Sequence, residues 1–189
     1  MSFDHQSASD GELVTLSLAG RKSAFAEIMR RHRAAVFRLI RSHIGDADEA
    51  LDLTQETFVA AWRALRRYDP ARSLLTWLCA IAINKCRDWG RKRAVRRFFS
   101  FAAPLEDARH VSEEQPELDT AAADRQELAR VTDAIANLPA PLKEALILRT
   151  IEGLSQAETA DILGVSAKTV ETRLYRARAK LRDMLSTSG

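Results

Sequence analysis

The pattern that most constrains the fold lies near the end of the chain, in the stretch LSQAETADILGVSAKTVETRLYRARAKLRDML. Ser155 is followed three residues later by Glu158, the spacing of a capping box that satisfies the first amide groups of a helix. Gly164 can take the left-handed conformation of a tight turn, and Ser166 can cap a second helix. These signals predict a helix, a short turn and another helix.

The second of these helices has two different faces. Its apolar residues fall within one sector and are expected to face the core: Val170, Leu174, Ala177, Leu181 and Leu185. Residues 165–182 carry six basic side chains against a single acid, Glu171. Such a helix can place its N-terminal half on base edges in the major groove while its flanking cations contact phosphates. We therefore interpret it as a DNA-binding helix rather than a merely solvated amphipathic one.

The whole chain is predicted to be all-α. It has only seven Gly and five Pro among 189 residues, and the alternation typical of strands is hard to find. Residues 10–97 are predicted to form a four-helix N-terminal domain, with breaks near Gly20, near Gly45 and at residues 68–70.

The middle of the chain is interpreted as an acidic flexible linker at residues 98–124. It contains two prolines and no sustained apolar period, and residues 101–126 carry seven acids against two arginines. Residues 125–187 are then predicted to form a C-terminal four-helix domain that contains the helix-turn-helix.

The third predicted helix of the N-terminal domain is amphipathic. We expect its inward face to comprise Leu51, Gln55, Phe58, Trp62 and Leu65. The opposite side is expected to carry Asp52, Glu56 and Arg63.

A second basic patch closes the N-terminal domain. Residues 21–100 hold 18 Lys and Arg against 8 Asp and Glu, a balance that favours a polyanionic partner. One polar helix face is predicted there, made of Asn84, Arg87, Asp88 and Arg91. Nearby aromatic side chains could stack on unpaired bases, but Trp77 and Trp89 are interpreted first as core residues.

Other classes of site have little support in the sequence. Cys79 and Cys86 are seven residues apart on an apolar stretch and are interpreted as buried thiols. The four His are scattered, so no catalytic residues, metal site or cofactor are predicted. The chain shows neither a signal peptide nor a run of the ~20 apolar residues that spans a membrane, so we expect a cytoplasmic protein without membrane insertion.

From these motifs the chain resembles the extracytoplasmic-function sigma factors, small two-domain bacterial subunits of RNA polymerase. The motifs occur in the family's order: DLTQETF at 52–58, YDP at 68–70, TWL at 76–78, N-x-x-x-D-x-x-R at 84–91, LP at 138–139, and GLS at 153–155 followed by TVETRLYRARAKL at 169–181.

The resemblance implies three groups of site residues. Docking on the clamp of the polymerase's largest subunit would involve Asp52, Gln55, Glu56 and Arg63. Melting of the minus-ten element and capture of its unpaired strand would involve Tyr68, Ser73, Asn84, Lys85, Asp88, Arg91 and Lys92. Reading the minus-thirty-five element as duplex would involve Lys168, Thr169, Glu171, Thr172, Arg173, Tyr175 and Arg176.

The resemblance also implies partners: core RNA polymerase, with the flap of its second-largest subunit besides the clamp, promoter DNA and an anti-sigma factor. Three residues depart from the family pattern. Leu51 stands where an acid is common, Thr159 replaces a branched aliphatic residue and is expected to weaken packing, and Glu171 occupies a position that often holds Arg. Glu171 could accept a hydrogen bond from a cytosine amino group.

Two alternatives are weighed against this reading. A conventional two-domain helix-turn-helix regulator would need a ligand pocket or a dimerisation face in its N-terminal half. A nuclease would need carboxylate, His or Cys residues at metal or triad spacing, which the sequence does not offer.

Overall fold

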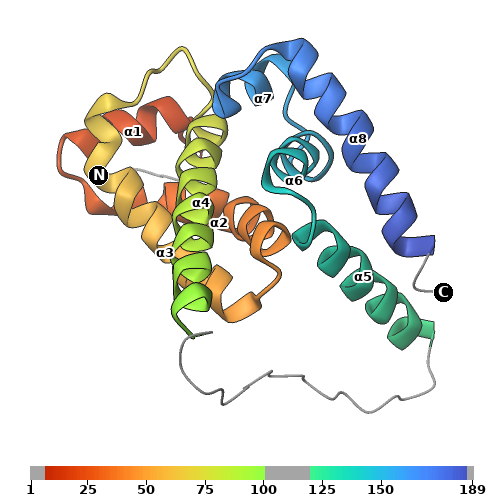
Figure 1. Cartoon of the computed structure of the whole chain (residues 1–189). Coiled ribbons are helices and arrows are strands. Elements are labelled where there is room, and N and C mark those ends of the chain that lie inside the picture. The colour runs from red at the N-terminus through yellow and green to blue at the C-terminus, as the bar shows by residue number, and fades with distance from the viewer. Residues whose placement is uncertain (1–6, 101–119, 187–189) are drawn as a thin grey trace.

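The computed structural model describes residues 7–100 and 120–186, and every regular element in these two ranges is helical (Figure 1). The N-terminal domain contains α1 (Asp10–Leu18), α2 (Lys22–Ile44), α3 (Ala47–Ala64), the short 3-10 helix η1 (Leu65–Arg67) and α4 (Leu74–Ser100). The C-terminal domain contains α5 (Thr120–Ala136), α6 (Ala140–Leu146), the π-helical turn η2 (Ile147–Ile151), α7 (Gln156–Leu163) and α8 (Ala167–Ser186). The all-α prediction with two helical domains is confirmed.

The breaks predicted near Gly20, near Gly45 and at residues 68–70 all fall between helices of the N-terminal domain. Ser9 and Glu12 form a capping box at the start of α1. Gly45, with φ +83°, ends α2 in the left-handed region that favours glycine. Asp46 then caps α3, because its carboxylate accepts the amide protons of Asp48 and Glu49, each at 3.0 Å.

The predicted inward face of α3 is partly wrong. Phe58 and Leu65 are buried, but Leu51 and Trp62 are each 40% exposed and Gln55 is also exposed. The buried stripe is instead shifted by about one residue and consists mainly of small side chains: Ala50, Leu53, Thr54, Thr57, Phe58 and Ala61. Small residues let α3 lie close to its neighbours. The prediction of the buried face had instead given most weight to the largest apolar side chains.

The C-terminal domain begins its second helix at the predicted proline break. Pro139 precedes the first residue of α6, and the helix then widens into the π-helical turn η2. Helix α6 packs against α8, and α7 packs against both. Ala145, Leu146, Ile147 and Leu148 are buried at the centre of this domain.

The two domains pack against each other. Helix α2 contacts α5 and η2, and α4 contacts α7 (Figure 1). A single cluster of buried side chains runs through both domains, from Leu13 and Phe58 to Leu148 and Ala177. No pattern in the sequence predicted this packing between the domains.

The bounds of α4 and α5 reach into the predicted linker. Helix α4 continues to Ser100 and α5 starts at Thr120. The remainder of the predicted linker, residues 101–119, lies outside the described residues.

Candidate nucleic-acid and polymerase interfaces

The helix-turn-helix forms as the sequence predicts. Ser155 and Glu158 make both hydrogen bonds of the capping box at the start of α7. Gly164 takes the left-handed conformation, with φ +66°, and its amide bonds back to carbonyls of α7. The hydroxyl of Ser166 accepts the amide proton of Thr169 at 3.1 Å and so caps α8. The turn therefore holds α8 at a defined angle to α7.

The outer face of α8 is available to a partner. Val170 and Ala177 are buried, which directs the opposite side of the helix to solvent. Tyr175 is 77% exposed, and Lys168 and Glu171 form an exposed ion pair at 3.0 Å on this side. The start of α8 therefore presents a cation, a carboxylate and an aromatic ring to solvent.

A shallow groove runs beside this face of α8. It has a volume of about 440 Å³ and is closed on its other side by Pro139, Pro141 and Leu142 at the start of α6. Five of the predicted minus-thirty-five residues line it: Lys168, Thr169, Thr172, Arg173 and Arg176. Glu171 and Tyr175 lie outside this groove.

The polar face of α4 is only partly free. Asn84 and Lys92 are exposed, and Asp88 and Arg91 form an exposed ion pair with each other. Lys85 turns toward α3, where its ammonium group donates to Glu56 at 2.9 Å. Arg87, on the same predicted face, turns toward the C-terminal domain instead.

The aromatic residues near α4 are held by the N-terminal domain. The Trp89 indole N–H donates to Glu49 at 2.9 Å, and the ring centroids of Tyr68 and Trp77 are 5.3 Å apart. All three pack against the core cluster, which confirms the interpretation of Trp77 and Trp89 as core residues. Ser73 accepts the amide proton of Thr76 at 3.1 Å, so it has a local role at the start of α4.

The predicted polymerase-docking residues share one groove on the N-terminal domain. This groove, about 490 Å³, is lined by Asp52, Gln55, Glu56, Val59, Ala60, Arg63 and Lys85. Val59 is 49% exposed, so the groove has an apolar element between its charged groups. The structure thus brings the four docking residues together on the exposed side of α3, and it adds Lys85 from the minus-ten group.

Several polar contacts cross between the two domains, and we call this contact region the seam. In three of its ion pairs the arginine belongs to the N-terminal domain and the carboxylate to the C-terminal domain. Arg87 of α4 makes a bidentate pair with Glu144 of α6 at 2.8 and 2.7 Å. Arg72, which precedes α4, pairs with Asp161 at 2.7 Å. Two further contacts join the domains: Arg38 with Glu152 at 3.5 Å, and the Thr76 hydroxyl, which donates to Glu158 at 2.9 Å.

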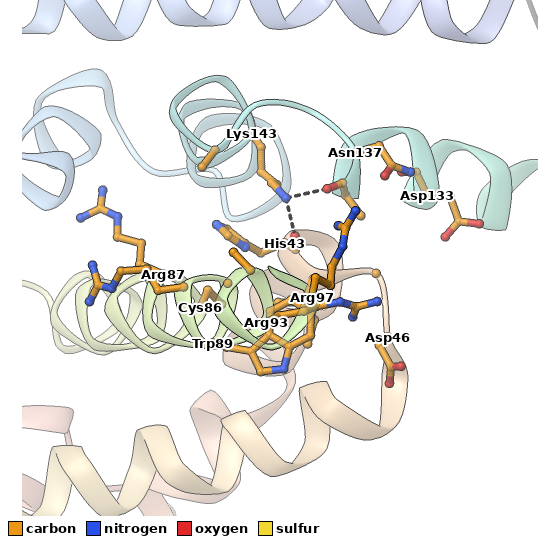
Figure 2. Close-up of a pocket in the computed structure, with 17 residues that line it drawn as sticks. His43, Asp46, Cys86, Arg87, Trp89, Arg93, Arg97, Asp133, Asn137 and Lys143 are labelled. Carbon is orange, nitrogen blue, oxygen red and sulfur yellow. Dashed lines mark hydrogen bonds between the residues drawn. The ribbon is translucent and has the colours of Figure 1, made fainter. Parts of the chain in front are cut away.

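Lys143 lies buried at the centre of the seam (Figure 2). Its ammonium group donates to the backbone carbonyl of His43 at 2.8 Å and to that of Ala136 at 2.6 Å. These carbonyls belong to the last turns of α2 and α5, where a cation is favourable. Burial nevertheless lowers the pKa of Lys143. Lys143 therefore ties the ends of two helices from different domains.

The seam contains buried ionisable groups of both signs. Burial opposes ionisation of Glu144, but the hydrogen bonds of Arg87 and the proximity of His43 outweigh it and lower the pKa of Glu144 to about 2. Burial lowers the pKa of His43, whose Nε2 lies 3.7 Å from Glu144, beyond hydrogen-bonding distance. Glu144 is therefore charged at neutral pH, beside a neutral imidazole.

Sequence reasoning did not select these seam residues. The available signal was the Lys143–Glu144 pair inside the apolar run from Leu142 to Leu148, because charged residues are rarely buried unless they are paired. The two cysteines, by contrast, are buried free thiols as predicted, and burial raises the pKa of each to about 12.

No helix in the described ranges is both long and apolar enough to cross a bilayer. Within residues 7–100 and 120–186, no three His, Cys, Asp or Glu side chains gather as metal ligands would. The fold and its exposed surfaces define a two-domain helical DNA-binding protein of transcription.

The comparisons give the family. Residues 28–96 match the model of Sigma-70 region 2, and residues 128–181 match that of Sigma-70 region 4. The chain is 40% identical over 179 residues to the RNA polymerase sigma factor CnrH of Cupriavidus metallidurans, covering 93% of this chain and 94% of that protein. It is 35% identical to the ECF RNA polymerase sigma factor SigM of Mycobacterium tuberculosis, covering 94% and 85%.

Solved structures agree. CnrH in complex with the cytosolic domain of CnrY matches with a TM-score of 0.70 and 34% identity, over 95% of this chain and 99% of that one. RpoE of Bartonella quintana, in complex with the anti-sigma factor NepR, matches with a TM-score of 0.67 and 26% identity, over 86% and 96%. The chain belongs to the extracytoplasmic-function sigma factors and acts in transcription initiation by RNA polymerase. This membership decides against a conventional two-domain regulator.

Proposed function

We propose that the chain docks on the clamp of core RNA polymerase through the α3 groove, reads an upstream duplex element with α8, and captures the unpaired strand of a downstream element with α4. The observation that carries this proposal is the α3 groove. It gathers Asp52, Gln55, Glu56 and Arg63 on one exposed face of α3, around the half-exposed side chain of Val59.

The two DNA contacts differ in chemistry. Helix α8 offers side chains at the spacing that reads base edges, with arginines at its flanks for phosphates. Asn84 is an exposed amide on α4, with Lys92 exposed two turns further on, and an amide can hydrogen-bond the edge of an unstacked base. Strand opening would then be driven by bases captured at about 1–3 kcal/mol each, which offset the base pairs lost.

We further propose that an anti-sigma factor binds this chain and that the C-terminal domain contacts the flap of the polymerase's second-largest subunit. The first proposal is supported by the two solved relatives, which are in complexes with the cytosolic domain of CnrY and with the anti-sigma factor NepR. The two α3 and α8 surfaces are both exposed and could be covered by such a partner.

Docking is tested by replacing Gln55 and Glu56 with Ala in the full chain. Co-purification with core polymerase is expected to be lost, while binding of duplex DNA by the free chain persists. Because the substitution of Glu56 also releases Lys85, which lines the same groove, from its 2.9 Å ion pair, Gln55→Ala alone tests docking with that pair intact. Unchanged co-purification of the Gln55 and Glu56 double variant would refute the docking assignment.

A further inference from the structure

A cavity of about 740 Å³ lies beside the C-terminal half of α4 (Figure 2). Its walls come from α4, from the turn between α2 and α3, from the end of α5 and from the start of α6. The volume falls within the range of about 300–1,000 Å³ that is typical of small-ligand pockets. Neither the α3 groove nor the α8 face contributes a residue to this cavity.

The charge around the cavity is predominantly positive. Five Lys and Arg side chains line it, against the carboxylates of Asp46 and Asp133. Residues 89–100 of α4 carry five cations and no acid, and Arg93 and Arg97 lie one turn apart on the cavity side. Like charges at this spacing on a helix repel each other, so a bound anion would relieve a repulsion that α4 otherwise retains.

Arg93 is positioned by a chain of contacts within the N-terminal domain. The Trp89 indole donates to Glu49 at 2.9 Å, and the guanidinium of Arg93 lies over the Trp89 ring, 5.0 Å from its centroid. Among residues 7–100 and 120–186, no carboxylate pairs with Arg93. A cation–π contact does not use the N–H donors of the guanidinium, so Arg93 can still direct two parallel N–H groups at a phosphate.

Gly90 leaves the α4 wall of the cavity without a side chain. It lies inside the helix, where glycine is less favourable than alanine, and a Cβ at this position would meet nothing within 4 Å. Packing against neighbouring elements therefore does not require a glycine here. The missing side chain instead keeps open the space that Arg93 and Arg97 line.

The cavity lies on the side of α4 that faces away from the proposed promoter contacts. Arg93 follows Asn84 by nine residues, so at about 100° for each residue it points about 180° away from Asn84 around the helix axis. An unpaired strand bound at the Asn84 face would not reach Arg93. The arginines of the cavity therefore suit a different anion, small enough to enter a space of about 740 Å³.

We propose that this cavity binds a small polyphosphate anion, either free or as part of a nucleotide, and that Arg93 and Arg97 are its phosphate ligands. Gly90 leaves room for the anion, and Trp89 positions Arg93. The site is separate from the surfaces proposed for polymerase and promoter, so its test requires neither of them.

The test is isothermal titration calorimetry of the full chain, with inorganic tripolyphosphate in one arm and adenosine triphosphate in the other. Arg93→Ala and Arg97→Ala are each expected to weaken binding by about tenfold or more, because each removes charge-assisted hydrogen bonds to a phosphate. Arg96→Ala is the matched control, since it removes the same charge from the same stretch of α4 but from a residue that does not line the cavity. It is expected to change the Kd by less than about twofold.

The two arms distinguish the sources of the anion. Equal affinity for both probes supports recognition of the polyphosphate group alone, and tighter binding of adenosine triphosphate supports a nucleotide. Failure of both probes to bind would overturn the proposal. Equal weakening by Arg93→Ala and Arg96→Ala would also overturn it, because binding would then follow the general charge of α4 and not the cavity.

Gly90 provides a test that leaves the charge unchanged. Gly90→Leu places a side chain in the cavity and should abolish binding, whereas Gly90→Ala adds only a methyl group in open space and should retain it. Unchanged binding by a folded Gly90→Leu variant contradicts the assignment of the cavity. Displacement of the probe by a single-stranded oligonucleotide contradicts it as well, because Arg93 would then belong to the promoter surface. Should Gly90→Leu fail to fold, as judged by circular dichroism, the comparison of Arg93→Ala with Arg96→Ala decides.

Discussion

Thr159 is fully buried in α7, the first helix of the helix-turn-helix, and its hydroxyl has no hydrogen-bond partner. A buried hydroxyl without a partner loses its hydrogen bonds to water on folding and gains none in return, at a cost of about 1–3 kcal/mol. Valine has nearly the same shape and carries a methyl group in place of the hydroxyl. We therefore expect Thr159→Val to stabilise the protein by about 1 kcal/mol or more.

The measurement is urea unfolding followed by circular dichroism. The transition midpoint is expected to rise with an unchanged m-value, because the folded state alone is altered. In thermal unfolding a gain of this size corresponds to roughly 2–4 °C for a chain of about this length. DNA binding should not change, since Thr159 is enclosed by the domain rather than placed on the α8 face.

Two threonines of α3 provide a matched control. Thr54 and Thr57 are as deeply buried as Thr159, but their hydroxyls donate to the carbonyls of Ala50 and Leu53, each at 2.7 Å. The same substitution to Val removes a satisfied group and leaves a carbonyl with one bond fewer, so it is expected to destabilise by about 1 kcal/mol. If Thr159→Val destabilises the protein as much as these controls do, the reasoning from the unpaired hydroxyl is refuted.

Two further predictions concern the turn and the seam. Gly164 has φ +66°, so Gly164→Ala should destabilise the protein by about 1–2 kcal/mol, measured by urea unfolding; Gly11→Ala, at a glycine without positive φ, is the control. His43 faces Lys143, Glu144 and Arg87, and burial between the packed domains lowers its pKa. The protein with its two domains packed together therefore binds fewer protons below pH about 6.5 than the protein with its domains apart. The radius of gyration is therefore expected to grow as the pH falls from about 7.5 to about 5.5. Glu144, with a pKa of about 2, stays charged through this window, whereas burial raises the pKa of Glu152 and so favours the packed state in acid. His43→Gln isolates the imidazole, and an unchanged pH response in that variant contradicts the prediction.

Much of the local structure could be predicted from the sequence because its causes are local. A capping box, a left-handed glycine and a proline break act within a few residues, so they predicted the start of α7, the turn at Gly164 and the start of α6. The exposed faces of α8 and α3 followed from the placement of charge, and the family motifs assigned roles to them.

The buried face of α3 depended on its neighbours. Periodicity in the sequence predicts an apolar sector of a helix but not which side of that sector contacts another helix. In α3 the small residues Ala50, Thr54 and Ala61 are the buried ones, because they allow close packing against α2 and α4. Leu51 and Trp62 were left half exposed for the same reason.

The sequence by itself determined the helices, the helix-turn-helix and the residues that share an exposed face, because those depend on short-range geometry. Only the tertiary structure decided that α2 and α4 meet α5, η2 and α7, and that Arg72 and Arg87 are paired with Asp161 and Glu144. Such pairs join residues 89 and 57 positions apart, as the residue numbers show, and no local rule relates charges at that separation. The sequence predicted the basic surface of α4, but it did not predict that Glu144 pairs with Arg87 of that helix.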